Sequence, residues 1–310
     1  MFVENRTALS PKVSTRSLPD ADVTALAFRV AFTLEAQREF EPLATERGLL
    51  GEAAVWGSSW ALSGHVQARA PRTRSQRVTL RFGAHAPVVL DISGDRTWQR
   101  RGDDLVVSET WPFETVALSA ERAFGGSVVM PAGERDGALH PSYTIVEQRN
   151  PFGIGLVVDV TRGDGVRLPN VEFADARVES HRDRPDPAVL RPLPSHPIMG
   201  KDLDALAARA AEGRRAEWPT HPAHHRATYS SRLAPGEMVV ITGARDDLVW
   251  ELPPSPALVS LRRGRSWTRV PGHIRHVAID LYRARAEIVY GHAAAHDKSR
   301  EVTDARVELA

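Results

Sequence analysis

Residues 119–126 read Ser-Ala-Glu-Arg-Ala-Phe-Gly-Gly and bring together an acid, a base, an aromatic ring and a glycine pair. Glu121 and Arg122 could pair with different neighbours, and a buried ion pair there would fix geometry rather than catalyse a reaction. Gly125 and Gly126 can adopt positive φ and allow another stretch of main chain to approach closely. Phe124 is large enough to anchor a corner. The combination favours a tightly packed structural turn over a catalytic one.

A histidine group is the second candidate for chemistry. His221, His224 and His225 follow His196 along the chain. Neutral imidazoles bind zinc, and an open zinc site needs about three protein ligands. Pro222 interrupts the spacing that a helical zinc motif requires. A solvated loop is therefore the favoured interpretation, and a metal-dependent hydrolase that uses these histidines stays open as an alternative.

Other reaction classes leave no signature. The chain has no cysteine, which excludes thiol catalysis and disulfide bonds. It contains no G-x-S-x-G nucleophile elbow. Residues 150–156, NPFGIGL, have glycines but no lysine and precede an expected strand, which disfavours a phosphate-binding loop. We expect no catalytic residue, no metal and no bound cofactor.

The charges give no reason to expect a nucleic-acid or membrane partner. The formal net charge of the 310 residues is +1, which provides little long-range attraction to polyanions. Residues 262–269, RRGRSWTR, form one short basic run, which is typical of a solvated edge strand. No run approaches the roughly 20 apolar residues of a membrane helix, and residues 1–12 do not resemble a secretory signal. The sequence predicts a cytoplasmic protein.

Tryptophans raise a third functional alternative. Trp56, Trp60, Trp98 and Trp111 lie on segments rich in expected strands. Exposed aromatic rings can stack on sugars, so a carbohydrate-binding β-sandwich stays open, although tryptophans in such positions more often pack in a core.

The elements that must position these side chains read mainly as strands. Large apolar residues recur at every second position in 24–34 and in 78–82, which predicts strands with one apolar face. The turn at 83–86 joins the second strand to 87–93 in an expected hairpin. Further strands are expected at 142–148, 155–160, 237–243 and 247–253, and a hairpin at 276–291.

One segment has helical spacing. Leu203, Leu206, Ala207 and Ala210 predict a short to medium helix over 201–213, after the proline-rich stretch 184–200. The fold class expected is mainly β, with antiparallel, sandwich-like sheets and this one helix. We expect a single β-rich domain, 1–310, with two subdomains at most: an N-terminal β region, 1–183, and a C-terminal region with the helix and hairpins, 184–310.

The order of several motifs resembles a bacterial family, domain of unknown function 2169. These motifs are ENRT (4–7), GDRTW (94–98), PFETVALSAERAFGG (112–126), NPFGIG (150–155), LPNVE (168–172), GE (236–237) and a late LP (252–253). The resemblance spans nearly the whole chain. Val116-Ala117-Leu118 stands where the family usually has a proline and a leucine, and residues 201–231 lack the G-T-Y-D and D-F-D blocks of the family.

The resemblance implies a non-catalytic adaptor or chaperone in type VI secretion. Its implied partners are a secreted effector with a proline-alanine-alanine-arginine tip domain and the valine-glycine-repeat spike, onto which the effector is loaded in the cytoplasm. We expect the motifs that carry this resemblance to form a structural hub or partner-binding surface. Its expected members are Arg6, Asp95, Arg96, Trp98, Glu121, Arg122, Phe124, Gly125, Gly126, Asn150, Pro151 and Gly153.

Overall fold

Alternating apolar residues produce strands along most of the chain. The computed structural model describes residues 2–17, 22–34, 40–43, 58–135, 138–188, 228–229, 233–244, 246–296 and 302–310. Within these residues the fold is mainly β, with several antiparallel sheets, as predicted. The helical elements described there are two 3-10 turns, η2 (Ala120–Arg122) and η3 (Val160–Arg162).

The chain divides into two compact units, each made of separate segments. Unit 1 is Met1–Ser63, Pro219–Val239 and Val249–Ala310, and unit 2 is Gly64–Trp218 and Val240–Leu248. This division differs from the subdomain boundary expected at residue 184, because late strands join early ones in each unit. Residue spacing predicts single elements, and it does not tell which distant strands pair.

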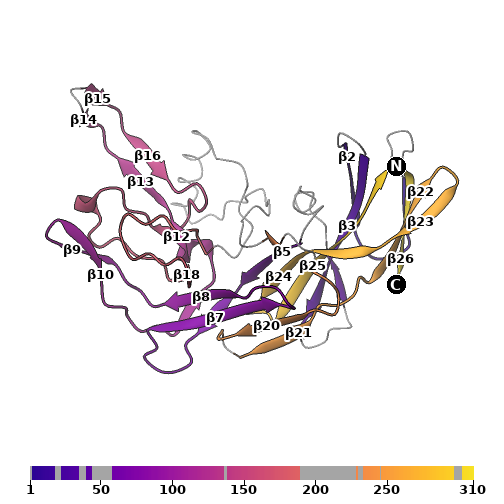
Figure 1. Cartoon of the computed structure of the whole chain (residues 1–310), viewed down its shortest axis with the longest axis horizontal. Coiled ribbons are helices and arrows are strands. Elements are labelled where there is room, and N and C mark those ends of the chain that lie inside the picture. The colour runs from indigo at the N-terminus through magenta and orange to yellow at the C-terminus, as the bar shows by residue number, and fades with distance from the viewer. Residues whose placement is uncertain are drawn as a thin grey trace. The chain divides into compact units, whose positions relative to one another are not determined.

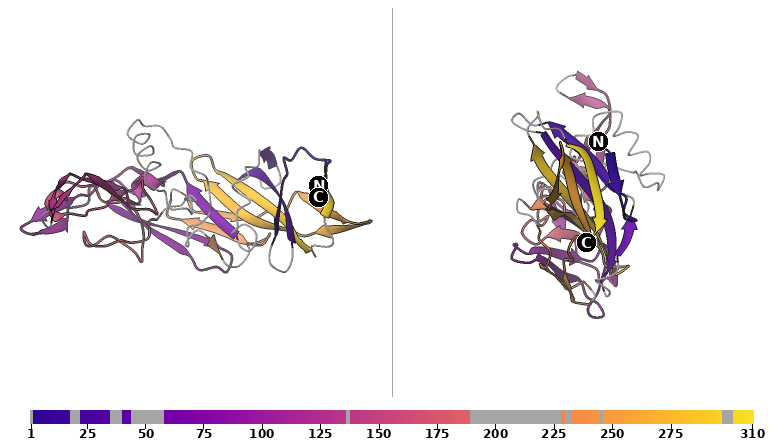
Figure 2. Two further views of the ribbon diagram at one scale, coloured as in Figure 1. Left: turned by 90° about the horizontal axis from the view of Figure 1, so that it is seen from above. Right: turned by 90° about the vertical axis from the view of Figure 1, so that its right-hand side faces the viewer.

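Unit 1 holds the strands of both chain ends. They are β1 (Phe2–Asn5), β2 (Lys12–Ser17), β3 (Asp22–Thr33), β4 (Phe40–Leu43), β5 (Ser58–Ser63), β19 (Thr228–Tyr229), β22 (Ala257–Arg263), β23 (Ser266–Val270), β24 (Gly272–Asp280), β25 (Arg285–His296) and β26 (Val302–Leu309). One sheet has the order β1-β26-β22-β23, and a second has the order β19-β5-β24-β25-β3-β2, with β4 paired to β3. β1 runs parallel to β26, so the first and last strands are neighbours in one sheet (Figure 2).

The core of unit 1 follows the predicted alternation. Leu26, Phe28 and Val30 of β3 are fully buried. Ala27 and Ala31, on the other face, are also buried, so this strand is covered on both sides. The expected hairpin at 276–291 is β24 paired antiparallel with β25.

Unit 2 contains the shorter strands (Figure 1). They are β6 (His65–Gln67), β7 (Ser75–Phe82), β8 (Val88–Ser93), β9 (Trp98–Arg101), β10 (Asp104–Val107), β11 (Thr115–Ala117), β12 (Phe124–Gly125), β13 (Ser127–Met130), β14 (Gly133–Arg135), β15 (Ala138–His140), β16 (Tyr143–Val146), β17 (Ile154–Gly155) and β18 (Val171–Phe173). β20 (Met238–Thr242) and β21 (Leu248–Glu251) each begin in one unit and end in the other.

Two features of unit 2 position the site. β7 and β8 form the predicted antiparallel hairpin, and β18 pairs with the outer side of β8. β13 and β16 pair as a two-stranded ribbon that continues toward β14 and β15, away from the other strands of the unit (Figure 1). A buried cluster of the same unit includes Trp98, Phe124 and Leu168, and Val128 of β13 packs against it.

One predicted strand is wrong over most of its length. The expected strand 155–160 is reduced to β17, which ends at Gly155. Gly155 has φ +96°, which turns the chain out of the extended direction. Leu156 and Val157 then enter the same buried cluster from consecutive positions, whereas a strand would place them on opposite faces. Asp159 ends the loop by accepting a hydrogen bond from the Thr161 N–H at 2.9 Å, which begins η3.

Some expectations concern segments outside the described residues. These are the helix at 201–213, most of the proline-rich stretch, and the histidines His196, His221, His224 and His225. Among the helices that are described, none is long and apolar enough to cross a membrane.

Candidate functional site

The turn that carries Gly125 and Gly126 packs directly against residues 150–153. Gly125 has φ +148°, and a Cβ atom there would lie 2.1 Å from the Asn150 carbonyl oxygen. Gly126 has φ +100°, and a Cβ atom there would lie 2.5 Å from the Gly153 carbonyl oxygen. Both positions therefore require glycine for conformation and for space.

Asn150 ties this turn together. Its Nδ2 donates hydrogen bonds to the carbonyl oxygens of Ala120 at 2.7 Å and Phe124 at 2.9 Å, and its own carbonyl accepts the Gly126 N–H at 2.8 Å. The Asn150 side chain is fully buried, so these bonds replace water. β12 and β17 pair in parallel across the same point. We call Phe124, Gly125, Gly126, Asn150 and Gly153 the glycine corner.

A buried ion pair lies in the same unit. Arg96 contacts Glu172 through Nη2 and donates a second hydrogen bond to the Pro169 carbonyl at 3.0 Å. Glu172 Oε1 accepts the Val178 N–H at 2.7 Å. Burial raises the pKa of Glu172 above its usual value, although the charge of Arg96 and the Val178 N–H oppose this effect. Arg96 and Glu172 thus anchor the start of β9 to β18.

A polar network links Asp95 to Arg122 on the surface side of the corner. Asp95 Oδ1 accepts hydrogen bonds from Arg167 Nη2 at 2.8 Å and Asn170 Nδ2 at 3.0 Å, and Arg122 Nη1 lies 3.4 Å away. Arg122 Nη1 also donates to Asn170 Oδ1 at 3.0 Å. Partial burial raises the pKa of Asp95, but the Asn170 and Arg167 hydrogen bonds and the neighbouring guanidinium charges outweigh it and hold that pKa below its usual value.

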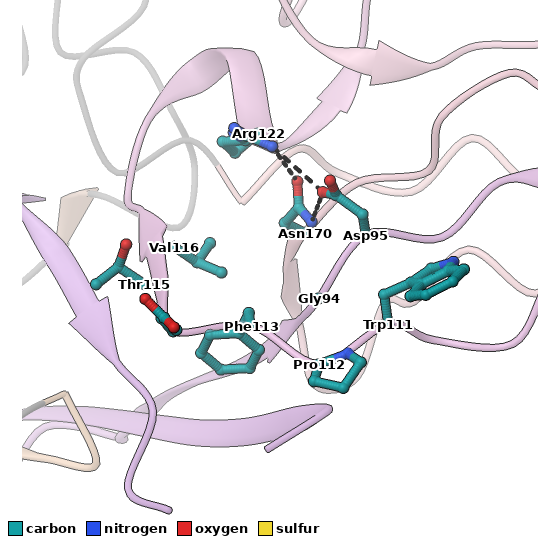
Figure 3. Close-up of a pocket in the computed structure, with 10 residues that line it drawn as sticks. Gly94, Asp95, Trp111, Pro112, Phe113, Thr115, Val116, Arg122 and Asn170 are labelled. Atoms are coloured by element: carbon teal, nitrogen blue, oxygen red, sulfur yellow. Dashed lines mark hydrogen bonds and ion pairs between the residues drawn. The ribbon is translucent and has the colours of Figure 1, made fainter. Parts of the chain in front are cut away.

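This network forms one wall of a pocket of about 640 Å³, which we call the Asp95 pocket. Figure 3 shows Arg122, Asn170 and Asp95 turned toward one another, with the segment 111–116 along the other side. The complete lining is Gly94, Asp95, Trp111, Pro112, Phe113, Glu114, Thr115, Val116, Arg122 and Asn170.

The wall 111–116 is irregular until β11 begins at Thr115, but it is fixed at several points. The Trp111 N–H donates to the Asp95 carbonyl at 2.9 Å, and the Phe113 N–H donates to the Thr73 carbonyl at 2.9 Å. A Cβ atom at Gly94 would lie 1.8 Å from the Trp111 carbonyl oxygen, so the wall can approach only because residue 94 is glycine. Trp111 is nevertheless 70 % exposed. A large aromatic ring is therefore held in solvent by a fixed main chain.

The structure brings most of the expected hub residues together, in three neighbouring groups. Phe124, Gly125, Gly126, Asn150 and Gly153 form the glycine corner, with Pro151 in the same loop; Asp95 and Arg122 form the polar network; Arg96 and Trp98 are buried beside them. Asp95 and Arg96 bind different partners rather than each other. Glu121 is exposed, and the buried ion pair of this region is made by Arg96 and Glu172.

The structure does not bring Arg6 into this group. Arg6 pairs with Glu4 at 2.6 Å and with Glu308 at 2.7 Å on the four-stranded sheet of unit 1. Of the tryptophans, Trp60 and Trp98 are buried core residues, and Trp56 lies outside the described residues. Trp111 is the tryptophan that reaches the pocket.

Sequence reasoning missed three polar partners of the expected hub residues. Asn170, Glu172 and Arg167 lie in or next to the L-P-N-x-E block at 168–172. That block was a usable signal, because an asparagine and a glutamate beside a buried strand must find polar partners. Within the described residues, no group of three or more histidine or acidic side chains could hold a metal ion.

The arrangement is suited to binding. It presents an exposed indole ring, a guanidinium held by an amide, and a carboxylate whose charge is stabilised by its neighbours. Tryptophan and arginine are the residue types that most often dominate protein–protein binding energy. A carboxylate held in its charged form is a poor proton donor.

Comparison with known proteins places the chain in a family. No curated protein and no solved structure matches it. A family model described as "Uncharacterized protein conserved in bacteria (DUF2169)" matches residues 57–291, which include the glycine corner, the Asp95 pocket and the buried ion pair. Because the match covers well over half of the 310 residues, the chain belongs to the bacterial family DUF2169.

Proposed function

We propose that this protein is a non-catalytic cytoplasmic adaptor or chaperone that binds a type VI secretion effector and helps to load its tip domain onto the spike. In this proposal the Asp95 pocket holds a segment of the effector, and the glycine corner keeps the pocket in shape. The partner is a polypeptide, and no bond of it is made or broken.

One observation carries the binding part of the proposal. Trp111 is 70 % exposed, while its N–H is fixed to Asp95 and its carbonyl packs over Gly94. With the main chain fixed, only the two χ angles of the tryptophan remain to be ordered when a partner covers the ring, so little conformational entropy is lost. Arg122 stands in the same pocket and supplies the second residue type that is typical of binding hot spots.

The type VI part of the proposal rests on the order of the sequence motifs. ERAFGG and NPFGIG, which resemble the family pattern most specifically, form the two sides of the glycine corner. The region that departs from that pattern, 201–231, lies outside the described residues. The pocket is therefore built mainly from segments that carry the family motifs, although Val116 belongs to the other departure from the pattern.

A carbohydrate-binding function is the second candidate. An exposed indole beside fixed polar groups is also a common way to bind a sugar ring, and Trp111 lies beside Asp95 and Arg122. We favour a polypeptide partner because the motif order supports it independently of the pocket.

We expect Trp111→Ala to reduce co-purification of a tip-domain effector from the same genome by at least about tenfold, the usual cost of removing a hot-spot tryptophan. Tyr282→Ala is the matched control, because Tyr282 is 79 % exposed in unit 1 and lies far along the chain from the pocket. Both variants should keep the wild-type unfolding temperature, since both side chains face solvent.

Equal effector recovery with Trp111→Ala and wild type would remove the pocket from the proposal. A glycan array on the same samples tests the second candidate: saturable binding of one glycan, lost in Trp111→Ala, together with no effector recovery, would replace the adaptor function by carbohydrate binding.

A further inference from the structure

Only one nitrogen of the Arg122 guanidinium contacts the residues that the structure describes. Nη1 contacts Asn170 at 3.0 Å and Asp95 at 3.4 Å. Nε and Nη2 make no hydrogen bond with the described residues, and the side chain is 38 % exposed in the pocket. Nε and Nη2 form the edge of a guanidinium that can bind both oxygens of a carboxylate.

We propose that Arg122 binds the carboxylate of an aspartate or glutamate side chain in an extended segment of the partner, a specificity that rests on the proposed binding function of the pocket. Asn170 holds the guanidinium in place through Nη1 and leaves its Nε–Nη2 edge for the ligand. Because that edge is already oriented, little side-chain entropy is lost when the carboxylate binds.

The charges around Arg122 leave its guanidinium incompletely neutralised. Asp95 lies 2.8 Å from Arg167 and 3.4 Å from Arg122, so Arg167 competes for the Asp95 charge. Asn170, the nearest partner of Arg122, is uncharged. Glu114, the other carboxylate of the lining, brings the sum of the four charges to zero, so the preference for an acidic ligand depends on the Nε–Nη2 edge of Arg122 and not on net charge.

Glu114 acts against this ligand. It is the second carboxylate in the lining, and within the described part of the chain no hydrogen bond or ion pair engages its side chain. Removing its charge should strengthen the binding of an acidic ligand and weaken that of a basic one. The sign of the effect of Glu114→Gln therefore distinguishes the two kinds of ligand. Because Glu114 is exposed, we expect this variant to fold like wild type.

Trp111 indicates which kind of residue should neighbour the acidic residue in the partner segment. Its exposed ring offers an apolar face at the other end of the same pocket (Figure 3). An apolar side chain next to the acidic one in the partner segment would cover this ring and remove its surface from water. The inferred recognition element is an acidic residue with an apolar neighbour in extended chain.

The test uses the full chain labelled with ¹⁵N and three capped probes, acetyl-Gly-Glu-Leu-Gly-amide and the same peptide with Gln or Lys in place of Glu. The Trp111 indole N–H resonance, assigned by its loss in Trp111→Phe, reports binding. We expect the Glu peptide to shift it saturably and to bind at least about tenfold more tightly than the Gln peptide, the difference that a charge-assisted bidentate pair makes.

Two variants and one control test whether Arg122 and Glu114 act on the peptide as proposed. Glu114→Gln should tighten the Glu peptide about twofold to fivefold, as expected for loss of one exposed repulsion. Arg122→Lys keeps the charge but loses the two-nitrogen edge, and should weaken the Glu peptide about tenfold. Tyr282→Ala should bind like wild type.

Preference for the Lys peptide, weaker binding of the Glu peptide to Glu114→Gln, or no difference between the Glu and Gln peptides would overturn the inference. Its failure is separable from that of the adaptor function. If effector recovery depends on Trp111 but the Glu peptide neither binds nor competes with the effector, the adaptor function stands and the acidic specificity is wrong.

Discussion

Gly125→Ala is expected to lower the free energy of unfolding by about 4 kcal/mol, because backbone strain and overpacking each cost roughly 1–3 kcal/mol. The new Cβ would lie 2.1 Å from the Asn150 carbonyl oxygen and 2.9 Å from the Asn150 Cβ, and φ there is +148°. Neither neighbour can move without breaking the hydrogen bonds that Asn150 makes to Ala120 and Phe124. Chemical denaturation followed by circular dichroism measures the loss.

Gly102→Ala separates the two causes. Gly102 has φ +63°, but a Cβ atom there would meet nothing within 4 Å. It should therefore cost only about 1 kcal/mol, for conformation alone. A loss at Gly125 no larger than that at Gly102 would mean that the glycine corner is not tightly packed against Asn150.

Arg96→Met is expected to destabilise the protein by about 3 kcal/mol, the lower end of the cost of breaking one side of a buried ion pair. The substitution keeps most of the side-chain volume but leaves the Glu172 carboxylate with the Val178 N–H at 2.7 Å and Arg177 Nε at 3.9 Å as its remaining contacts. The double variant Arg96→Met, Glu172→Gln should recover at least half of the loss, because an uncharged amide is less costly to bury than a carboxylate.

The pH dependence of Arg96→Met provides a second check. Burial already raises the folded-state pKa of Glu172, and removal of Arg96 takes away the charge that opposes this rise. A carboxyl with a raised pKa in the folded state keeps a proton that the unfolded chain releases. The variant should therefore be closest to wild type below the ordinary glutamate pKa and should lose stability as the pH rises above it. A constant difference between the two proteins from pH 4 to pH 8 would contradict the role given to this pair.

The sequence predicted the conformation of Gly125 and Gly126 better than it predicted the residues against which they pack. Two adjacent glycines after an aromatic residue indicate positive φ and close packing, and Gly125 and Gly126 show both. The sequence does not reveal that Asn150 is the group they pack against, because that contact joins two loops whose distance depends on the whole unit. The N-P-x-G-x-G block therefore indicated that residues 150–155 belong to the hub, but it did not indicate which residues they contact.

The polar pairings were predicted less well. Asp95, Arg96 and Arg122 were expected in one cluster, but local sequence does not tell which way each side chain points. The Arg96 side chain points into the core and contacts Glu172. The Asp95 side chain points outward and contacts Arg167. Alternation along an extended segment explains this division once the path of the chain is known.

The expected strand at 155–160 failed for a related reason. Its residues are apolar and β-branched, which favours a strand, but Gly155 and the Asp159 cap impose a loop. The apolar side chains still enter the core, as Leu156 and Val157 do from consecutive positions. The composition of residues 155–160 therefore predicted correctly that apolar side chains are buried there, but it predicted the wrong backbone conformation.

Site-specific photocrosslinking in bacteria tests most directly whether the Asp95 pocket holds a partner polypeptide. A photoreactive phenylalanine derivative would replace Thr115, an exposed lining residue, or Tyr282 in unit 1 as the control. We predict a crosslink to a tip-domain effector from position 115 and none from position 282. Absence of any crosslinked protein at position 115 while position 282 captures the effector would contradict the account.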